Sequence, residues 1–451
     1  MKRYDVLLTY EIKNREIENI CLLKYELERR GYSVGICMQY NTFFEVPEPI
    51  EAEVVVIPGY YRPRAIFYTS SHLVKTKKIV NLRWEQVATN EEENDIGTLC
   101  SIKKWGYDAV HIAWGIHAVE KMVKEWGVPP KNVKLTGHIG LDFLRGNLCN
   151  YFENKESILK KYNVPINKRI NLFISSLVFG TYPAYVIKNS TVNKDPNFNN
   201  KRVQESVETQ KTLLSWFEKV LEEYKEDVII YRPHPEEKNN TILKNLAAKQ
   251  PRFFVISEES VKQWILVSDK IYTWLSTSVA EVYSAGKGCS ILRPIEVAYE
   301  NDMCIYNGAE FIDNYETFKK EFEQKHQTFS LKEEMIKKHY YINENKYSYE
   351  LVCDVIEDVY KNEKYLLKKP LDNPFSGLIN IERIKNWIKR IISKSKVCNM
   401  IYNKKLFPNS KFRYFLDDVI YVREKIKKNY VTPDEINNII KKIDLCMIGK
   451  G

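Results

Sequence analysis

DVIIYRPHPEEK, residues 227–238, joins an apolar run to a turn that two prolines stiffen. The apolar residues 228–231 suit a strand that is covered on both faces, as in a parallel sheet. Because proline cannot continue a strand ladder, we expect Arg232 and His234 on a stiff turn at the carboxyl end of this strand. Ligands of open α/β sheets bind at that end, and an Arg beside a His suits a phosphate or diphosphate.

A second anion-binding loop is predicted about forty residues further along the chain. The apolar run Lys270 to Leu275 leads into Ser276, Thr277 and Ser278, which open a helix that carries Glu281. Hydroxyls beside the free N–H groups of a helix start favour an anion. A further strand, Arg169 to Ser176, ends in Ser175 and Ser176 and is expected at the same edge of the sheet.

The remaining pattern alternates strands with helices, which predicts a doubly wound parallel sheet of the α/β class. In the first half, strands are expected at 4–10, 32–38, 54–57, 78–82, 109–113 and 133–135, with a helix over 15–30. Residues 145–168 read as a linker with a short helix, and 179–200 as a long loop. The first strand-helix turn lacks the GxGxxG fingerprint, so a nicotinamide or flavin enzyme is not expected.

RPHP followed by STSVAEVYSAGK resembles the carboxyl-terminal half of GT-B glycosyltransferases of bacterial surface polysaccharides. This group includes polysialyltransferases, capsule Kdo transferases and teichoic-acid polymerases that use CDP-glycerol. The whole chain is most similar to surface carbohydrate biosynthesis proteins. The resemblance implies a GT-B fold with two Rossmann-like domains facing a cleft, a nucleotide-sugar donor bound in the second domain, and Glu281 on the ribose. We therefore predict an acceptor domain at 1–150, a donor domain at 165–370 and a basic helical extension at 371–451.

Several polar residues of the first half lie at predicted strand ends and are candidates for a general base. Glu11 and Glu16 flank the first turn, Glu85 follows Trp84, and His138 and Asp142 lie in LTGHIGLD. Glu11 and Glu16 fit equally well as charges at a helix start, and His138 as a packed residue. The Trp84 ring beside Glu85 suits a sugar platform, although a core position fits it as well.

Composition excludes several classes of protein. Nine scattered cysteines without a CxxC pair argue against a disulfide framework or a zinc knuckle, and a reducing cytoplasm fits best. No signal peptide and no run of about 18 uncharged apolar residues is present, so no membrane span is expected. Residues 371–451 hold 17 Lys or Arg against 8 Asp or Glu, so nearly all of the net charge of +10 lies there. No nucleic-acid-binding motif accompanies it, so nucleic acid is not an expected partner.

The basic extension predicts a contact with an anionic membrane surface through residues 381–413. Residues 381–396, IERIKNWIKRIISKSK, place isoleucines and Trp387 on one helical face and cations such as Lys389 and Arg390 on the other. A helix that packs its isoleucines onto the protein body fits the same pattern. We expect a cytoplasmic protein that is peripheral on the inner face of the membrane.

The most favoured function is a glycosyltransferase that moves a sugar, or a polyol phosphate, from a CMP- or CDP-activated donor to a glycan or lipid-linked glycan acceptor. No DxD pair stands at a strand end, so no metal and no cofactor are expected, and cationic side chains would stabilise the leaving nucleotide. A non-hydrolysing sugar-nucleotide 2-epimerase, which shares the TGHIGLD-like run, remains an alternative. A non-catalytic sugar-binding subunit of a capsule assembly complex is a third.

Overall fold

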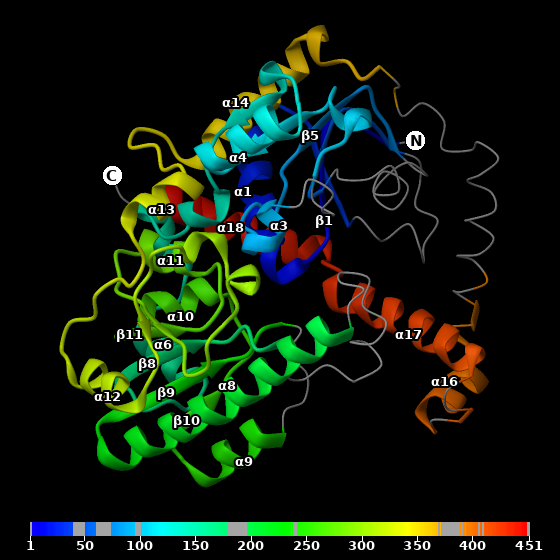
Figure 1. The fold of residues 1–451 in the computed structure, drawn as a ribbon. Coiled ribbons are helices and arrows are strands. Elements are labelled where there is room, and N and C mark those ends of the chain that lie inside the picture. Colours follow the sequence, from blue (N-terminus) through cyan, green and yellow to red (C-terminus); the bar gives the residue numbers. More distant parts are fainter. Residues whose placement is uncertain are drawn as a thin grey trace. The chain divides into compact units, whose positions relative to one another are not determined.

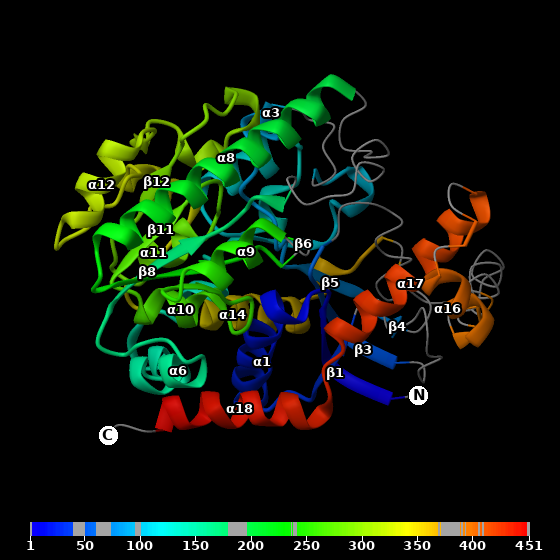
Figure 2. The ribbon, with the colours of Figure 1, turned by 90° about the horizontal axis from the view of Figure 1, so that it is seen from below.

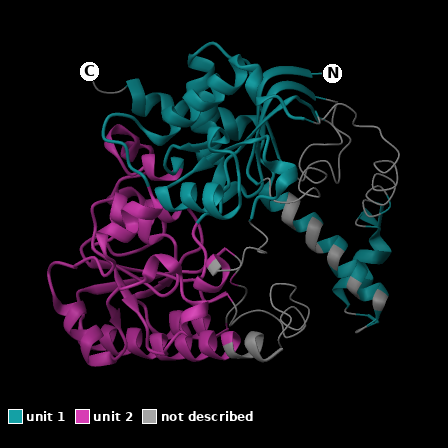
Figure 3. Cartoon of the chain, turned by 45° about the horizontal axis from the view of Figure 1, so that its top comes forward, with its two compact units in different colours: residues 1–86, 97–139, 341–451 teal, residues 87–96, 140–340 magenta. Residues whose placement is uncertain are grey.

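The computed structural model describes residues 2–38, 50–59, 74–94, 101–178, 196–235, 237, 241–368, 370, 388, 391–392, 394–404, 406–407 and 410–448. The chain divides into two compact units, shown in Figure 3. Unit 1 comprises residues 1–86, 97–139 and 341–451, and unit 2 comprises residues 87–96 and 140–340. Each unit is built around its own parallel sheet.

Unit 1 contains a seven-stranded sheet in the order β2-β1-β3-β5-β6-β7, with β4 paired to β3. Its strands are β1 (Lys2–Tyr10), β2 (Val34–Met38), β3 (Ile50–Ile57), β4 (Val74–Lys75), β5 (Lys78–Asn81), β6 (Val110–Ala113) and β7 (Val133–Leu135). All neighbours pair in parallel. The central strands are apolar and buried on both faces, as a parallel sheet covered by helices requires.

The helices of unit 1 come from three separate segments of the chain, including both of its ends (Figure 1). They are α1 (Lys13–Arg29), η2 (Lys104–Gly106), α4 (Ile116–Glu120), the π-helical turn η3 (Lys121–Glu125), η4 (Pro130–Asn132), α14 (Ser348–Lys361), η9 (Glu363–Tyr365), α16 (Lys396–Asn403), α17 (Lys411–Asn429) and α18 (Pro433–Ile448). The apolar face of α1 is buried throughout.

Unit 2 contains a six-stranded parallel sheet in the order β10-β9-β8-β11-β12-β13. Its strands are β8 (Arg169–Ile174), β9 (Asp227–Arg232), β10 (Phe253–Val255), β11 (Lys270–Thr273), β12 (Ser290–Leu292) and β13 (Phe311–Ile312). Its helices are α3 (Asn90–Asn94), α5 (Ile139–Asp142, which begins at the unit boundary), η5 (Gly146–Tyr151), α6 (Lys155–Lys161), α8 (Pro196–Glu223), α9 (Thr241–Lys249), α10 (Val261–Val267), α11 (Val279–Ser284), η7 (Tyr299–Asn301), η8 (Cys304–Tyr306), α12 (Tyr315–Glu323) and α13 (Glu333–His339). Apolar side chains of α8, α9 and α12 form the core on one face of this sheet.

The predicted α/β class is confirmed, and the predicted strands match observed ones to within a few residues at their ends. One local prediction is wrong: residues 196–200 were expected in a long loop but begin α8. A single apolar residue in this polar stretch gives no helical period. The rest of that expected loop, residues 179–195, lies outside the described residues.

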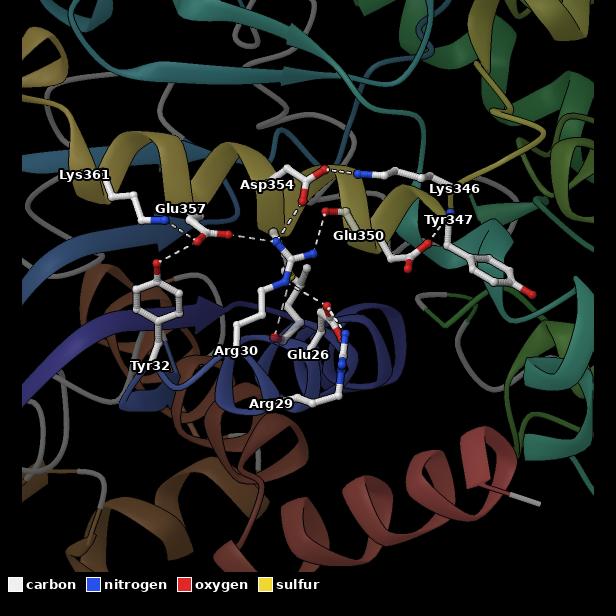
Figure 4. Close-up of polar contacts among 12 residues, drawn as sticks. Glu26, Arg29, Arg30, Tyr32, Lys346, Tyr347, Glu350, Asp354, Glu357 and Lys361 are labelled. Carbon is white, nitrogen blue, oxygen red and sulfur yellow. Dashed lines mark hydrogen bonds and ion pairs between the residues drawn. The ribbon is translucent and has the colours of Figure 1, made fainter. Parts of the chain in front are cut away.

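Helix α14 belongs to unit 1, although the sequence analysis assigns residues 341–370 to the second domain. Its apolar face packs on α1, β3 and β5. Arg30, directly after α1, reaches across to α14 (Figure 4). Its guanidinium donates to Glu26 at 2.8 Å, to Asp354 at 2.8 Å and to Glu357 at 3.1 Å. These bonds fasten the two helices at the edge of their apolar contact.

The last helix of the chain is also part of unit 1. Figure 2 shows α18 beside α1, and the Tyr25 hydroxyl of α1 donates to Asp444 at 3.1 Å. Lys13 pairs with Glu435 at 2.5 Å, and Tyr10 accepts a hydrogen bond from the backbone of Val431 at 3.2 Å. Residues 429–448 therefore stabilise the first strand and helix rather than extending as a separate tail.

Candidate functional site

Three loops meet at the carboxyl edge of the unit 2 sheet, because they follow the adjacent strands β9, β8 and β11. The RPHP turn follows β9, Ser175 and Ser176 follow β8, and Ser276 to Ser278 follow β11. The structure thus brings together the three sequence segments that were predicted to bind the donor. Two hydrogen-bonded connections, described next, fix these loops to one another.

The first connection is a buried network under the RPHP turn, centred on the Glu237 carboxylate. This carboxylate accepts from the Ser175 hydroxyl at 2.7 Å, the Tyr231 hydroxyl at 2.9 Å and the Gln210 amide at 3.1 Å. It also accepts from the backbone N–H of His234 at 3.3 Å, while its own backbone N–H donates to the His234 carbonyl. Burial raises the pKa of Glu237. The network holds the backbone of His234 from both sides.

Ser175 therefore contributes to the packing beneath the turn and is itself buried. Glu237 was not predicted as a site residue. It lies in a polar run after the turn, where the sequence does not distinguish a buried Glu from an exposed one. Only the spacing of three residues from His234, which suits a side chain folding back onto the turn, could have indicated it.

Arg232 and His234 differ in how the structure uses them. The Arg232 guanidinium donates to the backbone carbonyls of Glu258 at 2.8 Å and Glu259 at 2.6 Å, and burial lowers its pKa to about 10. It thus ties the β9 turn to the loop after β10. His234 is half-buried at the carboxyl edge. Its role as a donor ligand, like that of Arg232, stays a prediction.

The second connection joins the loops after β8 and β11. The Ser176 hydroxyl accepts from the backbone N–H of Leu275 at 3.0 Å. The Tyr306 hydroxyl accepts from the Ser276 N–H at 2.9 Å and donates to the Ser276 carbonyl at 2.8 Å. Tyr306 is buried and was not singled out from the sequence. It fixes the backbone of the serine-rich loop in one conformation.

The serine-rich loop leads into the short helix α11. The Ser276 hydroxyl accepts from the backbone N–H of Ser278 at 3.2 Å, so one of the N–H groups expected for an anion is engaged inside the loop. The Ser278 side chain makes no capping hydrogen bond, and Thr277 is exposed. The ligand-binding role of Thr277 and Ser278 stays a prediction.

Glu281 lies in the first turn of α11 and is half-buried. Burial raises its pKa, and the nearby Lys262 ammonium opposes that rise. Asp142, at the end of α5, is fully buried and lies 3.8 Å from Arg145. The role of Asp142 as a general base stays a prediction.

In unit 1, Arg15 organises the carboxylates that were predicted near the first turn. Its guanidinium pairs with Glu16 at 2.7 Å and with Glu85 at 3.1 Å. Glu16 is fully buried, burial raises its pKa, and it accepts from the backbone N–H of Glu11 at 2.7 Å. Glu16 thus shapes the turn, whereas 60% of the Glu85 side chain is exposed. Arg15 was not predicted as a site residue.

His138 follows β7 and sits among the residues that follow β5 and β6. Its ring lies edge-on to Trp114, with centroids 4.2 Å apart, and to Trp84, with centroids 5.8 Å apart. The Gln86 side chain links these loops, donating to the Ile112 carbonyl at 2.9 Å and accepting from the Trp114 N–H at 2.9 Å. Trp84 is buried, so in this structure its ring packs against His138 and is not an open sugar platform.

The backbone before His138 is set by a glycine. Gly137 has a φ of +85°, and a Cβ there would lie 2.4 Å from the Tyr341 carbonyl oxygen and 2.6 Å from the Ser348 hydroxyl. Only glycine fits both the left-handed backbone and this close approach. The orientation of His138 therefore depends on the segment that leads into α14.

The predicted membrane-surface residues Trp387, Lys389 and Arg390 lie outside the described residues. Among the helices that the structure describes, none is long and apolar enough to cross a bilayer.

Of the comparisons with known proteins, only the one with solved structures found similar proteins. No protein-family model matches the chain, and no curated protein matches it. A variant of the wall teichoic acid polymerase TagF has 13% identity and a TM-score of 0.51 over 80% of this chain and 89% of that one. A UDP-N-acetylglucosamine 2-epimerase from Listeria monocytogenes has 12% identity and a TM-score of 0.46 over 83% and 100%. The chain has the GT-B fold. At this identity the likeness shows the fold and leaves the reaction open.

Proposed function

We propose that this GT-B protein transfers a sugar, or a polyol phosphate, from a CMP- or CDP-activated donor to a growing surface polysaccharide. The observation that carries the proposal is the meeting of the RPHP turn, the Ser175-Ser176 pair and the serine-rich loop on adjacent strands of unit 2. Polar groups at the carboxyl edge of a parallel sheet are where a nucleotide ligand is expected. The likeness to TagF, a wall teichoic acid polymerase, agrees with a donor of this kind.

In this proposal His234 donates a hydrogen bond to the leaving phosphate, since its backbone is held from below by Glu237. Thr277 and Ser278 bind the same group, and Glu281 accepts from the ribose hydroxyls. Glu85, Glu11, His138 and Asp142 remain the candidates for the general base. Transfer proceeds without a metal ion, so added chelator leaves the rate unchanged.

The test is incubation with CMP-, CDP- and UDP-linked donors while nucleotide release is followed. Release of CMP, CDP or UDP from one class of donor, increased by added glycan acceptor, is the expected result. A 2-epimerase, the second candidate, would isomerise a UDP-linked sugar without releasing nucleotide. Binding without either reaction would favour a non-catalytic sugar-binding subunit.

We also propose that the chain contacts an anionic membrane surface through the segment around α16. Large apolar side chains in this segment are exposed: Ile388, Ile391, Val397, Met400, Leu406, Phe407, Phe412 and Phe415. Exposed cations lie among them at Lys394, Lys396 and Lys404. Exposed apolar groups interleaved with cations suit the boundary between lipid headgroups and acyl chains.

A further inference from the structure

Arg293 is a buried cation that neither the sequence motifs nor the proposed donor contacts include. It directly follows β12, which pairs in parallel with β11, so it lies at the same carboxyl edge as the serine-rich loop. Only 5% of the residue is exposed. Its guanidinium lies 6.0 Å from the Trp274 ring, 5.4 Å from the Tyr306 ring and 4.9 Å from the Phe311 ring.

The hydrogen bonds of this guanidinium are incomplete. Nη2 donates to the Asp302 carboxylate at 2.6 Å. Nε and Nη1 are buried and have no hydrogen-bond partner among the described residues, and the same holds for the indole N–H of Trp274. A buried donor without an acceptor is unfavourable, more so when it carries charge. Three such donors at the ends of two neighbouring strands call for an acceptor that the described part of the chain does not provide.

These donors lie next to the serine-rich loop. Trp274 precedes Ser276 by two residues, and Tyr306, whose ring faces the Arg293 guanidinium, holds Ser276 by its backbone N–H and carbonyl. Tyr306 therefore contacts both the guanidinium and the serine-rich loop. An N–H group of a guanidinium donates a strong, charge-assisted hydrogen bond to a phosphoryl oxygen.

We propose that Arg293 and Trp274 form an oxyanion subsite that takes a phosphoryl oxygen of the nucleotide-activated donor. The inference rests on the proposed function, because the donor supplies the phosphate. The Asp302 carboxylate keeps the guanidinium in place through Nη2, and the Nε–H and Nη1–H donors, which point in different directions, are each able to meet an oxygen of the ligand. Because both atoms are covered in this structure, binding requires a local shift of the neighbouring side chains.

The experiment compares the affinity of the full-length protein for CMP and for cytidine, by isothermal titration calorimetry, so that the ratio isolates the phosphate. Wild type should bind CMP more tightly than cytidine, and Arg293→Met should reduce that preference about 10- to 100-fold. Trp274→Phe, which keeps the ring and removes the N–H, should reduce it to a smaller extent. Inorganic phosphate, as a competitor, should displace CMP from wild type more readily than from Arg293→Met.

Lys270→Met is the matched control, since Lys270, at the start of β11, is another buried cation of unit 2 and donates to the backbone carbonyls of Glu321 and Phe322. Lys270→Met should leave the ratio of the affinities for CMP and cytidine unchanged. If Arg293→Met does not fold, as judged by circular dichroism, Arg293→Gln, which also removes the charge, is measured in its place. An unchanged ratio in folded Arg293 variants overturns the inference and leaves the proposed function standing. Failure of wild type to bind CMP, CDP or UDP would instead contradict the proposed function.

Discussion

At the scale of single residues, His234 is the side chain on which the proposed chemistry depends most. His234→Ala removes a donor from the leaving phosphate, and loss of one such donor costs about 100- to 1000-fold in rate at comparable sites. We expect nucleotide release to fall by this factor while the thermal unfolding temperature stays unchanged. His117→Ala, a change in α4 of unit 1, is the control. Near-normal turnover of His234→Ala would exclude the assigned role.

Glu237 should act on the reaction only by positioning His234. Glu237→Gln keeps the shape but weakens acceptance from Ser175, Tyr231 and the His234 N–H. We expect kcat to fall about tenfold with a smaller change in the KM of the donor. Glu236→Gln, at the preceding position in the sequence, is the control. Equal kinetics of Glu237→Gln and wild type would show that the network is structural only.

The sequence predicted the strands of unit 2 and the position of the motif residues at the strand ends. Apolar runs and prolines determine strands and turns through interactions between residues close in the chain. Sequence reasoning missed Glu237, Tyr306 and Arg293, since a single Glu, Tyr or Arg in a polar stretch carries no signal of burial. Their positions depend on which strands become neighbours. It likewise predicted the start of α1 but could not tell that Arg15 would join Glu16 to Glu85.

At the scale of elements, the contact between α1 and α14 should depend on pH. Burial raises the pKa of Glu26 and Asp354, but hydrogen bonds from Arg29, Arg30 and Lys346 outweigh it, so both pKa values are lowered. The pKa of Glu357 is also lowered, chiefly by Lys361. A carboxylate whose pKa is lowered by folding stabilises the fold at pH values above its unfolded pKa, which is about 4. That contribution is lost as the pH falls through the folded pKa.

Arg30→Met tests this contact. We expect it to lower the free energy of local opening of α1 and α14 by about 1 to 2 kcal/mol at pH 7, measured by hydrogen exchange of their amides. The difference from wild type should shrink below about pH 4, where the carboxylates take up protons. Arg29→Met, which removes a more exposed partner of Glu26 only, should have a smaller effect (Figure 4). A difference that is independent of pH would contradict the ionic account.

A helical pattern identifies the apolar face of a helix but not the surface that covers it. The apolar stripe of α14 is visible in the sequence, yet its partners β3 and β5 lie some 290 residues earlier in the chain. The same holds for α18, whose contacts with α1 place residues 429–448 on unit 1.

At the scale of the whole molecule, membrane contact is best tested with point variants. Removal of all residues after Pro370 would also remove α18 from α1, so it would change the fold together with the surface. Val397 and Phe407 are 60% and 61% exposed. We expect wild type to co-sediment with vesicles that contain phosphatidylglycerol at low salt and to be released by added salt. Val397→Asp with Phe407→Asp should weaken this binding about tenfold or more.

The control for this prediction is Tyr299→Asp, which changes an equally exposed side chain of unit 2. It should bind vesicles as wild type does. Equal vesicle binding by wild type and by the double variant Val397→Asp with Phe407→Asp would contradict the proposed membrane contact.

The central claim is that the carboxyl edge of the unit 2 sheet holds the nucleotide of the donor. Photo-crosslinking with a photoreactive CDP analogue, followed by peptide mass spectrometry, tests it most directly. The account predicts crosslinks within residues 232–237 and 274–281 that excess unmodified CDP abolishes. Competed crosslinks confined to other parts of the chain, such as the amino edge of the same sheet around Lys270, would contradict it.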